Sequence, residues 1–168
     1  MIWLLRLWKQ HFLLVEWLIA LLLTGGFYIW FERYGGAASI ETVLKGNRAT
    51  LYGTAASIFG SLLGFAITAT SIVLGFSSSD RLAVLRGSAH YPTLWKTFSA
   101  TIRALALATV IALVCLVWDR DNQPASWLTV VLFFSVLLAI FRIGRTIWVL
   151  EQIIALVTIP PLNHKGDS

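Results

Sequence analysis

Four long apolar stretches, interrupted by very few charged residues, constrain this chain more than any other feature of its sequence. They cover residues 12–31, 51–76, 98–118 and 127–148. An α-helix needs about 20 residues to cross roughly 30 Å of hydrocarbon, so each stretch is long enough to span a membrane. The apolar residues run continuously rather than in alternation, which favours helices over the strands of a barrel.

The composition explains why these stretches cannot simply form a soluble core. Of the 168 residues, 58% are hydrophobic and 12% are charged, which is about half the charged fraction of a soluble domain. A fold of this size leaves much of its surface exposed, so the apolar excess cannot be hidden within one globule. A cytosolic enzyme, a disordered tail and a free nucleic-acid-binding domain are therefore disfavoured. We expect an all-α integral membrane protein, a single transmembrane domain (residues 1–168) built as a four-helix bundle.

The basic residues predict the orientation of the four helices. With the N-terminus in the cytoplasm, nine lysines and arginines lie on the cytoplasmic side and four on the other, in agreement with the positive-inside rule. The nine are Arg6, Lys9, Arg81, Arg86, Lys96, Arg103, Arg142, Arg145 and Lys165, and the four are Arg33, Lys45, Arg48 and Arg120. The net charge of +5 then reflects contact with the lipid bilayer and its anionic head groups rather than with nucleic acid. We expect a multi-pass protein of the bacterial inner membrane with both termini cytoplasmic.

Short helices are expected outside the four spans. Ser39 is placed to cap a small helix that ends at Leu44, with Gly46 as its stop, and this helix would lie on the membrane surface. Residues 77–80, Ser-Ser-Ser-Asp, would cap a second short helix on the cytoplasmic side. Apolar residues keep helical spacing beyond the fourth span, which predicts a cytoplasmic or interfacial helical extension over residues 149–159.

The second span differs from the others because small residues recur along its whole length at steps of three and four. They are Gly53, Ser57, Gly60, Gly64, Thr68, Ser71 and Gly75. Small side chains let two helix backbones approach closely. The third span carries a matching series, namely Ala100, Ala104, Ala108, Ala112 and Cys115. One interpretation is close packing of the second and third spans, within one chain or between chains. The other is that hydroxyls near this stripe, including that of Ser61, line a narrow water path in an oligomer.

Four charged residues lie within the predicted spans, towards the cytoplasmic side: Glu16, Arg103, Arg142 and Arg145. Such residues often mark functional sites, although long arginine side chains near a helix end can reach the interface. Glu16 is too short to do so, and we expect it to pair with Arg103 or with an arginine of the fourth span. A role of Glu16 in proton or ion coupling is the alternative. A single glutamate in the first of four helices also resembles the small multidrug-resistance transporters, a resemblance that Glu16 alone carries.

Motifs of known enzymes are missing from the sequence, which has no HExxH, no Gly-x-Ser-x-Gly and no paired intramembrane aspartates. Cys115 is the only cysteine and the three histidines are far apart, so we expect no metal site and no cofactor. A small helical protein of this kind is expected to act by assembling. The leading hypothesis is a homo-oligomer that forms a pore or a permeability pathway for ions or small solutes, for example as a membrane-perturbing effector. The alternatives are a non-conducting accessory or scaffold subunit of a larger membrane complex and a small coupled transporter that uses Glu16.

Overall fold

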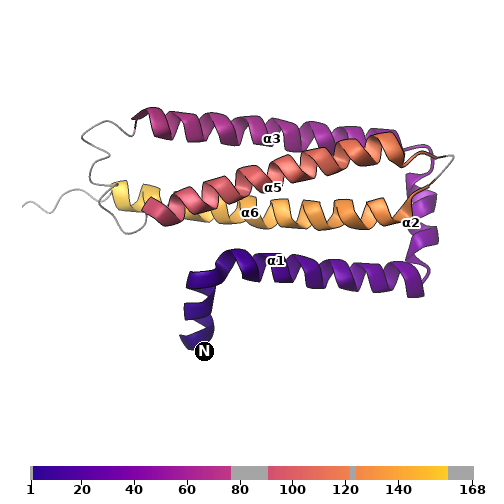
Figure 1. Ribbon diagram of the computed structural model, residues 1–168, viewed down its shortest axis with the longest axis horizontal. Helices are drawn as coiled ribbons and strands as arrows, with labels where there is room; N and C mark the ends of the chain where they lie inside the picture. The colour runs from indigo at the N-terminus through magenta and orange to yellow at the C-terminus, as the bar shows by residue number, and fades with distance from the viewer. Residues whose placement is uncertain (1, 77–90, 122–123, 159–168) are drawn as a thin grey trace, which may run out of the picture.

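The computed structural model describes residues 2–76, 91–121 and 124–158 of the chain (Figure 1). Within these residues the chain forms five α-helices and no strand. They are α1 (Ile2–Arg33), α2 (Gly36–Leu44), α3 (Arg48–Phe76), α5 (Tyr91–Trp118) and α6 (Ser126–Thr158). The predicted all-helical class is confirmed for this part of the chain.

Four of these helices are long and apolar enough to cross a membrane, as predicted. The segments that meet this requirement are Phe12–Arg33, Arg48–Ile72, Trp95–Trp118 and Ser126–Glu151. Large apolar side chains along them point outwards, and Leu22 and Phe65 are 73% and 74% exposed. Soluble monomers rarely expose a continuous apolar surface of this kind, so a lipid environment explains it best.

The main contacts between the long helices run in the order α3, α5, α6 and α1 (Figure 1). α5 and α6 therefore each have two long neighbours, whereas α3 and α1 have one main neighbour each and lie at opposite edges. Burial follows this order, because 33% of an 18-residue apolar stretch within α5 and within α6 is buried, but only 6% of such a stretch within α3. Among the described helices that could span a membrane, α3 receives the least cover from its own chain.

Small residues on α5 let its two neighbours approach it closely. Ala108, Ala112 and Cys115 are fully buried, and larger side chains from both sides fill the space that these small residues leave. These larger side chains are Tyr52 and Phe59 from α3 and Leu128 and Leu132 from α6. The second and third spans thus pack together within the chain, which agrees with the first of the two interpretations of the small-residue stripe. The α3 face in this contact is formed by Tyr52, Ala56 and Phe59 and not by the whole glycine stripe.

The short helix α2 crosses the end of the long helices (Figure 1), and its start differs from the prediction. The predicted cap at Ser39 is wrong, because Gly35 precedes the helix in the left-handed conformation with φ of 71°, which glycine adopts without steric cost. Ser39 lies one turn inside the helix, where its hydroxyl donates to the Gly35 carbonyl at 3.5 Å. The predicted end at Leu44 is confirmed, and Gly46 follows with φ of 78°.

The two ends of the described chain also carry helix. α6 continues to Thr158, so the described part of residues 149–159 is helical. The first turns of α1 point away from the direction of the rest of that helix (Figure 1). The helix predicted after residues 77–80 lies outside the described residues.

Candidate functional site

The small-residue stripe of α3 lies mostly on the open side of the helix. Gly53 and Gly60 are half-buried, and Gly60 lies near Thr109 of α5. The other members with described surroundings are exposed, and these are Ser57, Ser61, Gly64, Thr68 and Ser71. Gly75 belongs to the last turn of α3, beyond the residues whose exposure is described. The stripe therefore runs from the edge of the α3–α5 contact onto a face that the rest of the described chain leaves uncovered.

Contacts among the described residues do not require glycine on this face. A Cβ atom built at Gly53 or Gly64 would meet nothing within 4 Å, and one at Gly60 would meet only the Cγ2 atom of Thr109 at 3.8 Å, an ordinary contact. Glycine inside a helix costs about 0.5–1 kcal/mol relative to alanine. Within residues 2–76, 91–121 and 124–158 of one protomer, no close helix contact at Gly53 or Gly64 offsets this cost.

The exposed hydroxyls of the stripe differ in their hydrogen bonding. Thr68 and Ser71 each donate to a carbonyl one turn earlier in their own helix, at 2.9 Å in both cases. The side-chain hydroxyls of Ser57 and Ser61 make no hydrogen bond within the described chain. These two residues flank Gly60, the middle residue of the Arg48–Ile72 segment. A hydroxyl at this depth facing lipid would lack the partners that water supplies at the membrane surface.

A buried ion cluster joins α1 to α6. The Arg142 Nη1 atom lies 2.7 Å from Glu16 Oε2, and Arg145 Nε donates to Glu16 Oε1. Arg142 Nη2 also donates to the backbone carbonyl of Leu13 at 3.1 Å, and the Arg145 guanidinium lies 4.4 Å from the centre of the Phe12 ring. The expectation that Glu16 pairs with an arginine of the fourth span is confirmed, and both fourth-span arginines take part.

Arg103 does not pair with Glu16 in the structure. It is exposed, and its Nε donates to the carbonyl of Ser99 one turn away on α5. α5 contacts the Arg142 backbone through Thr101 instead, whose hydroxyl lies 3.2 Å from the Arg142 carbonyl oxygen and 2.7 Å from the Thr146 hydroxyl. The cluster is therefore held by three helices, although its charges come from α1 and α6.

A second buried cluster, at the opposite end of the helices, was not predicted. Arg48 Nη1 lies 2.6 Å from Asp119 Oδ2, the Tyr52 hydroxyl donates to the same oxygen, and the Ala125 amide donates to Asp119 Oδ1 at 2.8 Å. Arg48 Nε is also 3.4 Å from Asp121 Oδ1. This cluster ties the start of α3 to the end of α5 and to the turn before α6. The positions of the two residues in the sequence were a usable signal for this contact. Arg48 begins the second span and Asp119 directly follows the third, so antiparallel packing of the two spans brings them to the same end of the bundle.

Neither cluster has the composition of a metal site, and no group of three potential metal ligands occurs among the described residues. Comparisons with protein families, with characterised proteins and with solved structures found no match for this chain. The structure defines the class of protein only broadly, as a helical chain with four helices compatible with a membrane bundle. The uncovered face of α3 and the two ion clusters are its candidate functional features.

Proposed function

We propose that this chain is a homo-oligomeric protein of the bacterial inner membrane that forms a pathway for ions or small solutes. In the oligomer, the uncovered face of α3 is directed towards the symmetry axis. Copies of Ser57 and Ser61 line the pathway, and the glycines permit close contact between neighbouring helices. The four spans of each protomer complete a helical bundle around this axis.

The observation that carries the proposal is the pair of unpartnered hydroxyls at the middle of α3. Ser57 and Ser61 are exposed, they flank the centre of the span, and the described chain supplies neither with a hydrogen-bond partner. Hydroxyls in the hydrocarbon core are stable when they contact water or a polar group of another helix. An oligomer arranged around α3 provides one or both of these partners.

The position of α3 in the fold supports the same arrangement. It lies at one edge of the row of helices, with α5 as its main neighbour, and its outer face is free of contacts from the rest of the described chain. An edge helix can meet its copies without any rearrangement of the protomer. The glycines with empty surroundings, Gly53 and Gly64, then gain the close approach that is missing within one chain.

Exposed tryptophans are consistent with two membrane interfaces. Trp30, Trp118 and Trp127 are 43%, 70% and 64% exposed and mark the end at which α1 and α5 end and α6 begins. Trp95 and Trp148, at 39% and 55% exposure, lie towards the other end of α5 and α6. Tryptophan is enriched at both membrane–water interfaces. The excess of basic residues on the side of Trp95 and Trp148 supports an orientation with both termini in the cytoplasm.

A cysteine at position 57 is expected to react with a charged, water-soluble thiol reagent, and this modification is expected to change solute flux through liposomes. The experiment uses Cys115→Ala as background, since the native cysteine is buried and separate from this face. The reagent reacts with the ionised thiol, and a thiol surrounded by lipid does not ionise. A charged reagent also does not enter lipid. Modification of the cysteine therefore shows that water reaches this depth of the span. Ser57→Cys in that background is therefore the test variant.

The matched control is Ile58→Cys. Ile58 is 52% exposed at the same depth, and one residue along a helix turns the side chain by about 100° onto a different face. We expect this variant to react at least tenfold more slowly than Ser57→Cys. Equal rates for the two variants, or a modified Ser57→Cys protein with unchanged flux, would contradict a pathway along α3. Assembly without any flux would favour the non-conducting scaffold instead.

Gly64→Leu is expected to weaken self-association at least tenfold, corresponding to about 1.4 kcal/mol, and to leave the folded protomer intact. The leucine side chain enters open space within the chain, but it would separate two α3 helices that meet at this residue. The measurement is the oligomeric state in nanodiscs and in detergent as a function of protein concentration. Gly26→Leu is the control, because Gly26 of α1 is exposed and also has open surroundings. Unchanged association of Gly64→Leu would remove α3 from the interface.

A further inference from the structure

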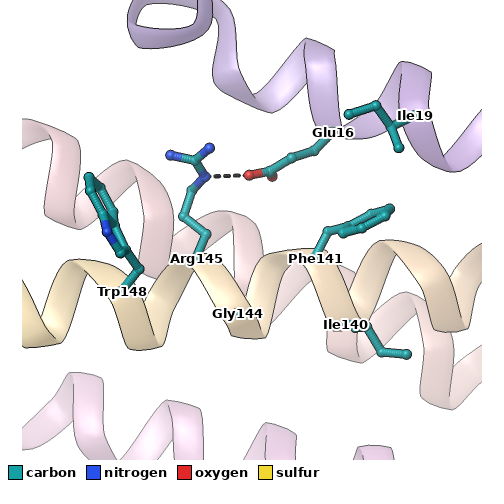
Figure 2. A pocket seen from close by; sticks show the side chains of 7 residues that line it. All are labelled: Glu16, Ile19, Ile140, Phe141, Gly144, Arg145 and Trp148. Carbon is teal, nitrogen blue, oxygen red and sulfur yellow. Dashed lines mark hydrogen bonds and ion pairs between the residues drawn. The ribbon is translucent and has the colours of Figure 1, made fainter.

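A groove of about 520 Å³ lies between α1 and α6 beside the buried ion cluster (Figure 2). Its apolar wall is formed by Ile19 of α1 and by Ile140 and Phe141 of α6. Gly144 widens the groove, because it is exposed and a Cβ atom there would meet nothing within 4 Å. Ile140 is 54% exposed, so the groove opens sideways onto the surface that a bilayer would cover.

The polar end of the groove is formed by Glu16 and Arg145, with Trp148 one turn further along α6 (Figure 2). Arg145 lies six residues before Glu151, the last residue of the apolar segment of α6, which corresponds to about 9 Å of helix. Ile140 lies eleven residues before that end, at a depth of about 17 Å. The groove thus has its charged end near the membrane surface and its apolar end in the hydrocarbon, in the same order as a phospholipid.

The charge of the cluster favours an anion. Among the described residues, the cluster contains two guanidinium groups, of Arg142 and Arg145, and one carboxylate, of Glu16. The resulting excess of positive charge lies where water is scarce and screening is weak. A phosphate group of a membrane lipid would offset this excess if it lay at the depth of Arg145 and Trp148.

We propose that this groove binds one anionic phospholipid, with the phosphate at Arg145 and an acyl chain along Ile19, Ile140 and Phe141. Arginine suits this role because its planar group binds phosphate through parallel hydrogen bonds while it retains other partners. Trp148 lies beside the glycerol region, where its ring is stable in a mixed polar and apolar environment. The site needs insertion into a membrane, but it is independent of assembly around α3.

The test measures binding of phosphatidylglycerol and phosphatidylcholine with matched chains to the full-length, delipidated protein in detergent, by native mass spectrometry and by the shift in unfolding temperature. We expect one tightly held phosphatidylglycerol, bound at least tenfold more strongly than phosphatidylcholine.

Gly144→Leu should reduce this binding at least tenfold, because the new side chain fills the groove and leaves the ion cluster unchanged. Gly25→Leu, an exposed glycine of α1 with open surroundings, should bind as the parent does. Arg145→Gln should abolish the preference between the two lipids.

Three results would overturn the proposal. The first is equal binding of the two lipids by the parent protein, because recognition would then not depend on head-group charge. The second is unchanged phosphatidylglycerol binding by Gly144→Leu. This variant keeps all charges of the cluster, so it tests the groove even if Arg145→Gln fails to fold. The third is an equal shift in unfolding temperature with inorganic phosphate alone, because the acyl chain would then contribute nothing.

Discussion

Replacing Asp119 by alanine is expected to lower the free energy of unfolding by about 3–5 kcal/mol, because it leaves the buried guanidinium of Arg48 without its main partner. The side chain of Asp119 is fully buried and that of Arg48 is 5% exposed, so water cannot replace the missing carboxylate. Two further donors lose their acceptor at the same time, the Tyr52 hydroxyl and the Ala125 amide. Each of these adds a buried, unpaired polar group to the cost.

The measurement is unfolding of the full chain in mixed micelles titrated with a denaturing detergent. Asp121→Ala is the matched control, since Asp121 also contacts Arg48 but its side chain is 46% exposed. We expect this control to cost at most about 1 kcal/mol. The double variant Arg48→Met/Asp119→Leu removes both charges and should recover a large part of the loss. If Asp119→Ala and Asp121→Ala cost the same, the cluster does not connect α3 to α5 in the way that we infer.

This cluster also illustrates how far the sequence alone could lead. The apolar stretches predicted the four long helices, because hydrophobic length is a property of each segment by itself. The alanines of α5 predicted a closely packed helix for the same reason. The sequence placed Arg48 among the basic residues outside the spans, and it did not predict Asp119 as its partner. Their contact depends on the register between two helices, which hydropathy does not determine.

The order of the helices in space was likewise not predictable. Glu16 was expected to pair with Arg103 or with a fourth-span arginine, and charge and depth alone did not decide between them. The structure places α1 beside α6 and not beside α5, which selects Arg142 and Arg145. The stripe on α3 shows the same dependence on neighbours. Its small residues are visible in the sequence. The sequence does not tell which side of α3 packs against α5. In the structure that side carries the large side chains of Tyr52 and Phe59, and most of the stripe lies on another side.

Replacing Glu16 by alanine is the second change for which we expect a loss of about 3–5 kcal/mol in the free energy of unfolding. Glu16 is 5% exposed, and its carboxylate neutralises one of two guanidinium groups whose side chains are 9% and 13% exposed. Without it, Arg142 and Arg145, which lie three residues apart on α6, face the contact with α1 as two uncompensated positive charges. Glu32→Ala, at an exposed position on the same helix, is the control and should cost at most about 1 kcal/mol. A loss no larger than that of the control would mean that the cluster does not hold α1 in place.

A further variant distinguishes between two roles of Glu16, a structural ion pair and a site of proton or ion coupling. The triple variant Glu16→Leu/Arg142→Met/Arg145→Met removes all three charges, and apolar replacement of a buried ion cluster is often neutral or stabilising. If the cluster serves packing, this variant should regain most of the stability that Glu16→Ala loses and should conduct solutes as the parent protein does. If Glu16 carries a coupled proton or ion, flux should be lost in the triple variant even though its stability returns. We expect the first result, because both carboxylate oxygens of Glu16 are already engaged by arginines, whereas the uncovered hydroxyls lie on α3.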